Sequence, residues 1–192
     1  TPCGTLFPYT TLFRSATEAQ LQHLLGFGHR RIGYLHNISP GCVHRDFLYR
    51  REAFYQLLAE NSLPCRRHWV AFAGYDEPRI RAAARAVLQE DPAPTALICS
   101  DHHAAGVYDI AAELGLRVPR DLSVVGTDGL PAAETVTPKL TTLLLSRDRL
   151  ARLALDSLLA QHHGNQVPDR LTLKTELIVR DSSGPAPATG SP

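Results

Sequence analysis

Short apolar runs alternate with helical patterns along most of this 192-residue chain. The apolar runs predict strands at 31–36, 68–73, 95–100, 121–126, 140–144 and 171–180. The spacing of apolar residues predicts helices at 16–25, 46–61, 77–90, 102–114 and 148–160. Near-continuous apolar strands, each followed by a helix, are typical of a parallel sheet covered by helices on both faces. The alternation therefore predicts an α/β fold.

Composition narrows the class of protein further. Apolar residues make up 44% of the chain, enough to bury a core, and Lys plus Arg number 20 against 19 Asp plus Glu. Such a balance argues against binding nucleic acid through bulk charge. No apolar run approaches the roughly 18 residues of a membrane span, so no membrane partner is expected. The cysteines at 3, 42, 65 and 99 lack CxxC spacing and are interpreted as thiols of a reducing compartment.

The two ends of the chain differ in composition from the rest. Residues 1–15 repeat the unit Thr-Leu-Phe, lack the features of a secretory signal, and resemble the in-frame translation of a sequencing-adapter oligonucleotide. We interpret them as a non-native leader, the alternative being a genuine disordered one. On the leader interpretation the native protein begins earlier and this chain is a C-terminal fragment. The Pro-, Gly- and Ser-rich end, 184–192, is expected to be disordered.

Ligands of parallel α/β sheets bind beyond the carboxyl ends of the strands. Four residues of this chain lie at such strand ends and could contact a ligand. Asp101 could cap the helix that it opens or accept from ligand hydroxyls. Asp128 could belong to a turn with Gly129 or supply a second carboxylate. Arg50 could belong to a solvated basic cluster or direct its guanidinium at a ligand. Tyr75 could stack on an apolar ligand face.

We find no signature of an enzyme or of a metal site. The His pairs at 102–103 and 162–163 lack the spacing of a metal-binding helix and are interpreted as surface residues. Gly26-Phe27-Gly28 follows a helix and precedes a strand, which is the reverse of a dinucleotide loop. The chain contains neither a phosphate-binding P-loop nor a GxSxG motif. We therefore expect no catalysis, cofactor or metal.

Five segments, in order, resemble the effector-binding core of the lactose/galactose-repressor (LacI/GalR) family of bacterial transcription regulators. Each segment is a weak signal alone, but their order and spacing extend the resemblance over about 16–183. They are Gly28-His-Arg-Arg-Ile-Gly-Tyr-Leu35, Arg50-Arg-Glu-Ala-Phe-Tyr-Gln-Leu-Leu58, Pro94 to Gly106, Gly115-Leu-Arg-Val-Pro-Arg-Asp-Leu-Ser-Val-Val-Gly126 and Pro138-Lys-Leu-Thr-Thr142.

The resemblance implies a fold of two flavodoxin-like lobes, of the periplasmic-binding-protein type, with a small ligand between them. Residues 31–128 would form the second lobe. Residues 16–27 and about 147–163 would be remnants of a first lobe that is largely missing. The family's N-terminal helix-turn-helix has no counterpart in this sequence.

The resemblance also implies roles for the candidate residues. Arg50 matches an arginine that binds effector oxygens, and Asp101 matches a carboxylate that accepts hydrogen bonds from effector hydroxyls. Asp128 matches the first Asp of a GFDD turn. Tyr75 approximates an aromatic wall. Three positions depart from the family pattern and leave the identity of the effector open: Thr127, Gly129 and Leu145.

The expected function is effector sensing by a cytoplasmic transcription regulator. The effector would be a small polar molecule, on this resemblance a carbohydrate. The whole protein would be a homodimer that contacts operator DNA only through its N-terminal headpiece. The alternative is a periplasmic sugar-binding protein of a transporter, which shares the fold, and a flavodoxin-like enzyme is a third class.

Overall fold

One mostly parallel sheet organises the chain, as the alternation predicted. The computed structural model describes residues 8–37, 45–168 and 173–188. The strands lie in the order β2-β1-β3-β4-β5-β6, and all neighbouring pairs are parallel except β5 with β6. The strands are β1 (Ile32–His36), β2 (Val70–Phe72), β3 (Ala96–Ile98), β4 (Ser123–Asp128), β5 (Thr141–Leu144) and β6 (Glu176–Ile178).

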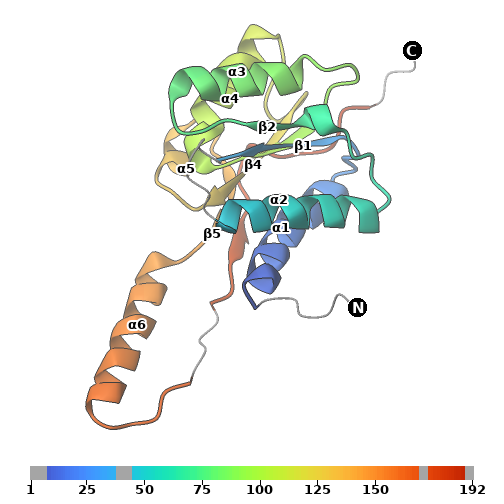
Figure 1. Ribbon diagram of the computed structural model, residues 1–192. Coiled ribbons are helices and arrows are strands. Elements are labelled where there is room, and N and C mark those ends of the chain that lie inside the picture. The colour runs from blue at the N-terminus through green and yellow to red at the C-terminus, as the bar shows by residue number, and fades with distance from the viewer. Residues whose placement is uncertain (1–7, 38–44, 169–172, 189–192) are drawn as a thin grey trace.

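Helices cover both faces of this sheet (Figure 1). One face carries α1 and α2 and the other carries α3 and α4, each face with its own apolar core. Short 3-10 turns precede β2 and α4, at Arg67–Trp69 and Asp101–His103. The helices are α1 (Pro8–Gly26), α2 (Arg45–Glu60), α3 (Glu77–Leu88), α4 (Ala104–Glu113), α5 (Ala132–Thr135) and α6 (Arg147–His162).

Local sequence explains where several of these elements begin and end. The side chain of Asp76 accepts a hydrogen bond from the backbone N–H of Arg79, so it caps α3, and Pro78 occupies the first turn. Beyond α4, Gly115 has a φ of +74°, a left-handed conformation that glycine adopts without strain. Gly33 in β1 has no room for a side chain, because an added Cβ would lie 2.9 Å from Leu97 and 3.0 Å from the carbonyl oxygen of Trp69.

The helix at residues 16–27, which was expected to be a remnant of a first lobe, packs on this same sheet. These residues belong to α1, whose Leu21 and Leu24 are fully buried in the same core as Phe54 of α2 and Val125 of β4. The helix also begins at Pro8, within the stretch expected to be a leader, and Arg14 donates to the carboxylate of Glu60 at 2.5 Å. The apolar spacing predicted the helix correctly, but it carried no information about which sheet the helix covers.

The C-terminal segment is also more ordered than its composition predicted. Ser182 is fully buried and forms two hydrogen bonds with Val124. The Val124 N–H donates to the Ser182 carbonyl oxygen at 2.8 Å, and the Ser182 hydroxyl donates to the Val124 carbonyl oxygen at 2.6 Å. Further along, the N–H of Ala186 donates to the carbonyl of Phe27 at 2.8 Å. Backbone pairing therefore holds residues through Ala186 on the body, whereas 189–192 lie outside the described residues.

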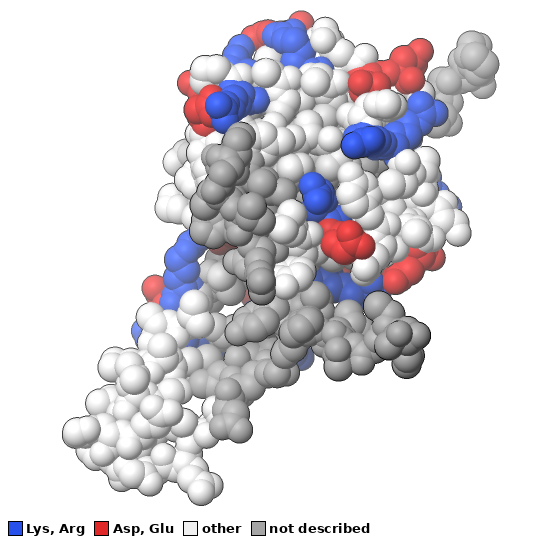
Figure 2. All heavy atoms as spheres, viewed as in Figure 1, with Lys and Arg blue, Asp and Glu red and all other residues white. Residues whose placement is uncertain are grey.

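One helix stands away from the rest of the molecule. α6 projects from the body, has no buried residue, and shows a mostly uncharged surface toward its far end (Figures 1 and 2). Four of its leucines are about half exposed or more: Leu150, Leu155, Leu158 and Leu159. In the part of the chain that the structure describes, no helix is long and apolar enough to cross a membrane.

The cysteines that the structure describes form no disulfide. Cys65 is exposed and Cys99 is buried, and both are free thiols. Burial raises the pKa of the Cys99 thiol, so this side chain is neutral at pH 7. Cys3 and Cys42 lie outside the described residues.

Candidate functional site

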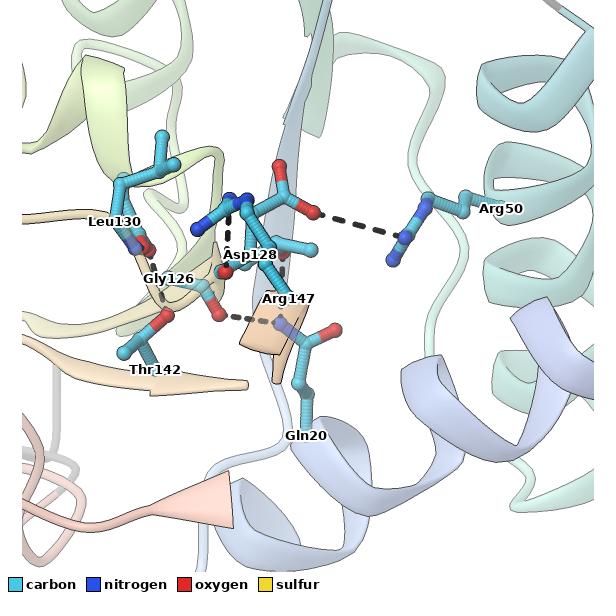
Figure 3. A network of polar contacts seen from close by, with 9 residues as sticks. Gln20, Arg50, Gly126, Asp128, Leu130, Thr142 and Arg147 are labelled. Carbon is cyan, nitrogen blue, oxygen red and sulfur yellow. Dashed lines mark hydrogen bonds and ion pairs between the residues drawn. The ribbon is translucent and has the colours of Figure 1, made fainter. Parts of the chain in front are cut away.

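An arginine and a carboxylate meet at the carboxyl edge of the sheet. Arg50 comes from α2 and Asp128 from the last position of β4, and Arg50 Nη2 lies 3.7 Å from Asp128 Oδ1 (Figure 3). The side chain of Arg50 is 16% exposed and that of Asp128 is 34% exposed. The parallel topology brings them together, because the ends of neighbouring parallel strands open onto one edge.

Asp128 is held in a specific backbone conformation at this edge. It has a φ of +96°, which is rare for a residue other than glycine, and Gly129 follows with a φ of +62°. Arg147 donates to the Asp128 carbonyl oxygen at 3.3 Å (Figure 3). Asp128 therefore lies in a left-handed conformation next to Gly129 and directs its carboxylate toward Arg50.

Polar atoms without protein partners line a small pocket around this pair. The described residues include three such buried atoms in the pocket wall: His36 Nδ1, Asn37 Oδ1 and Ser100 Oγ. Buried polar atoms are normally hydrogen-bonded, so a cluster of unsatisfied ones is a signal of ligand or solvent binding. The full lining is Tyr34, Leu35, His36, Asn37, Arg50, Cys99, Ser100, Thr127 and Asp128.

Burial shifts the titration of the aromatic groups in this pocket. Desolvation, with smaller contributions from Arg51 and His103, lowers the pKa of His36 to about 4, so its ring is neutral at pH 7. Desolvation likewise raises the pKa of Tyr34 to about 12. The two rings are stacked at 6.4 Å, and Tyr34 stacks on Phe54 at 5.1 Å. The aromatic floor of the pocket is therefore uncharged.

A larger cavity of about 380 Å³ adjoins the pocket, with Arg50 and Asp128 in both walls. Its remaining walls come from α1, from β5 and the residue after it, from α6 and from the segment before β6. Ala and Leu supply seven of the ten lining residues, namely Ala16, Leu143, Leu145, Leu150, Leu153, Ala154 and Leu173, and Thr175 completes the lining. The ion pair thus separates a polar pocket from an apolar cavity.

Asp101 does not take either of the two roles expected of it. It is 1% exposed, and its carboxylate accepts from the Thr142 hydroxyl and from the Leu130 N–H, each at 2.6 Å. Burial raises the pKa of Asp101, while the bonds from Thr142 and Leu130 oppose that rise. The carboxylate therefore ties β3 to β5 and to the turn after β4, and it neither caps its own helix nor faces the pocket.

Tyr75 lies away from the Arg50–Asp128 pair. Its side chain follows Gly74 at the end of β2, is 58% exposed, and meets the ring of His102 edge-on at 6.3 Å. It is not among the residues that line the pocket or the cavity. Tyr75 therefore does not form the expected aromatic wall of the pocket. Tyr34 supplies the aromatic surface there instead.

Sequence reasoning did not single out several residues that the structure brings to the site. Asp101 was chosen and its neighbour Ser100 was not, although both lie within three residues of the end of β3. Gln20 was missed too, because it lies on a helix assigned elsewhere. Its Nε2 donates to the Gly126 carbonyl at 2.6 Å and to Thr127 Oγ1 at 2.9 Å (Figure 3). The strand-end rule could have found Ser100, but no local pattern indicated Gln20.

Comparison with known proteins identifies relatives of the same architecture. Residues 21–183 match the family described as a periplasmic binding protein-like domain. The HTH-type transcriptional repressor PurR of Glaesserella parasuis is 33% identical over 173 residues, which cover 84% of this chain and 49% of that protein. The ribose operon repressor of Haemophilus influenzae is 29% identical over 161 residues, which cover 83% of this chain and 48% of that protein. The chain thus spans about half the length of these curated relatives.

A solved structure agrees with these matches. A LacI family transcriptional regulator from Mycobacterium smegmatis superimposes with a TM-score of 0.72 at 31% identity, covering 96% of this chain and 68% of that one. Among the described residues, no group of three or more His, Cys, Asp or Glu side chains could hold a metal ion.

Proposed function

The chain belongs to the effector-binding, periplasmic binding protein-like domains of LacI-family transcription regulators, and we propose that it senses a small hydroxylated molecule at the Arg50–Asp128 pair. Relatives that are transcriptional repressors favour this role over that of a transporter's sugar-binding protein and over that of an enzyme. The ligand would act as a signal and would leave unchanged.

The observation that carries this proposal is the juxtaposition of a guanidinium and a carboxylate beside unsatisfied buried atoms. A guanidinium offers only donors and a carboxylate only acceptors, so a pair of adjacent hydroxyls can accept from one and donate to the other. Ser100 Oγ, Asn37 Oδ1 and His36 Nδ1 would pair with further hydroxyls. A polyhydroxylated molecule such as a carbohydrate meets these requirements, and a ribose operon repressor is among the relatives.

Asp101 has a positioning role in this proposal. Its hydrogen bonds to Thr142 and Leu130 fix the ends of β4 and β5, from which Asp128 projects. Gly126 allows this arrangement, because an added Cβ would lie 2.1 Å from Asp101 Oδ1. The ligand contacts are therefore assigned to Arg50 and Asp128, with Ser100 and Asn37 as further contacts.

In the whole regulator, we propose that ligand binding shifts the balance between two arrangements of the lobes. α6 and its exposed leucines would belong to the first lobe, so closing the site would change how the two lobes meet. Coupling of this kind requires that the ligand bind one arrangement more tightly than the other. A cytoplasmic homodimer would convert the change into altered operator affinity.

Titration of the full chain with neutral sugars tests the proposal. We expect D-ribose, D-glucose or D-galactose, as free sugar or methyl glycoside, to shift amide NMR signals of residues around Ser100 and Asp128. In Arg50→Ala the affinity should fall at least tenfold, because a charge-assisted hydrogen bond is lost. Arg79→Ala is the matched control, since Arg79 lies on the outer helix α3 with a 56% exposed side chain. Equal affinity in Arg50→Ala, or no sugar-dependent shift at all, would refute the proposal.

A further inference from the structure

The cavity beside the ion pair has a chemistry that differs from that of the polar pocket. Leucines from β5, the residue after it, α6 and the segment before β6 supply five of its ten lining residues. Arg50 and Asp128 are the charged residues among those that line it. A volume of about 380 Å³ falls in the range of ligand sites and exceeds what a few hydroxyls need. A ligand held by the pair would therefore extend into an apolar space.

A free sugar would be compatible with the polar pocket but not with the apolar cavity. Hydroxyls that face Leu143, Leu145 and Leu153 would lose their bonds to water and find no partner in the wall, which is unfavourable. An apolar group in the same place would gain free energy in proportion to the area that it removes from water. The cavity thus selects for a ligand with an apolar part next to its hydroxyls.

We propose that the effector is a neutral amphipathic glycoside or a molecule of equivalent shape. Its hydroxylated ring would bind Arg50 and Asp128, and an aryl or alkyl substituent would fill the leucine-lined cavity. This inference rests on the proposed function, because it assumes that the pair binds hydroxyls. It adds the chemical class of the ligand, which distinguishes a substituted sugar from a free one.

The charges of the lining favour a neutral ligand. Arg50 is compensated by Asp128 at 3.7 Å, so the two together present no net charge to the cavity. A phosphate or carboxylate group on the ligand would be attracted by Arg50 but repelled by Asp128, and it would also lose its hydration against the leucines. A sugar phosphate should therefore bind more weakly than the corresponding neutral glycoside.

Matched glycosides test the inference on the full chain. The methyl and phenyl β-glycosides of D-glucose and D-galactose share their hydroxyls and differ only in the apolar substituent. We expect the phenyl glycoside to bind at least tenfold more tightly than the methyl glycoside of the same sugar, the gain typical of burying an aromatic group. Isothermal titration calorimetry or NMR titration gives both dissociation constants, and glucose 6-phosphate serves as the charged probe.

Two leucines of α6 provide a matched pair of variants. Leu153 lines the cavity, whereas Leu155 is 56% exposed and lies outside the lining. Two positions apart on a helix, the side chains point about 200° apart. Leu153→Gln should remove most of the preference for the phenyl glycoside while leaving the methyl glycoside affinity within about twofold. Leu155→Gln should leave both affinities unchanged.

The outcomes separate the two proposals. Equal binding of methyl and phenyl glycosides would overturn the inference and leave the proposed function standing. Failure of every sugar and glycoside to bind would overturn both. Leu145→Gln, in the segment after β5, repeats the test if Leu153→Gln does not fold, which circular dichroism shows. A phenyl preference that survives both substitutions would also overturn the inference, because the substituent would then lie outside this cavity.

Discussion

Arg50 on α2 and Asp128 at the end of β4 form an ion pair 3.7 Å long between a polar pocket and an apolar cavity. The two residues are far apart in the sequence and contact each other only because their elements converge at one edge of the sheet. Both side chains retain some exposure, so the pair remains accessible to a ligand.

This geometry predicts that Asp128→Asn separates binding from stability. Partly exposed ion pairs contribute about 0–1 kcal/mol to folding, so the free energy of unfolding in urea should change by less than about 1 kcal/mol. Sugar affinity should nevertheless fall about tenfold or more, because an ionised acceptor for ligand hydroxyls becomes a neutral amide. A large loss of stability with unchanged affinity would contradict the assignment of Asp128 to the binding site.

Asp101 should behave in the opposite way. Asp101→Ala removes the acceptor of the Thr142 hydroxyl, in buried surroundings, and of the Leu130 N–H, in part-buried surroundings. Leaving buried donors unpaired costs about 1–3 kcal/mol each, so urea unfolding should show a loss of about 2 kcal/mol or more. The control is Asp109→Ala, which breaks an exposed pair with Arg81 and should cost less than about 1 kcal/mol. Similar losses in the two variants would refute the positioning role.

A single methyl group at Gly126 should be poorly tolerated. The added Cβ of Gly126→Ala would lie 2.1 Å from Asp101 Oδ1 and 2.5 Å from Leu140 Cδ2, so the carboxylate must leave its hydrogen bonds. We expect a loss of about 3 kcal/mol or more in thermal or urea unfolding. Gly26→Ala, with no atom within 4 Å of the added Cβ, should change stability by less than about 1 kcal/mol. A stable Gly126→Ala protein would show that the edge is less tightly packed than the structure indicates.

The buried His36 predicts a component of acid destabilisation. Its pKa is about 4 in the folded protein and about 6.5 in the unfolded chain, so the fold favours the neutral ring. Its contribution to stability is complete above pH 6.5 and is lost as the pH falls toward 4, by up to about 3 kcal/mol in total. Urea unfolding between pH 7 and 4 measures this slope. His36→Asn should make the slope shallower than in the parent protein, and parallel profiles would show that His36 does not contribute.

Local pattern predicted most of the helices and strands. It did not predict the short helix α5, and the strand expected at 171–180 is described only at Glu176–Ile178. α3 shows why the elements were predictable, since Ile80, Ala83, Ala84 and Val87 repeat at helical spacing and Asp76 supplies a cap. Arg50 and Asp128 were identified because each lies beyond a strand on the expected edge. Asp101 lies there as well, but the direction of its side chain depends on Thr142 and Leu130, which no pattern near Asp101 indicates.

By itself the sequence determined a mostly parallel α/β sheet and the family through its ordered motifs, and it indicated the sheet edge at which Arg50 and Asp128 meet. Tertiary structure alone decided that α1 covers the same sheet as α2, that the segment at Ser182 pairs with β4, and that leucines from three elements enclose one cavity. The physical reason is the range of the interactions. Helical and strand periodicity arises from neighbours in the chain, whereas burial, hydrogen-bond partners and cavity walls depend on which distant surfaces pack together.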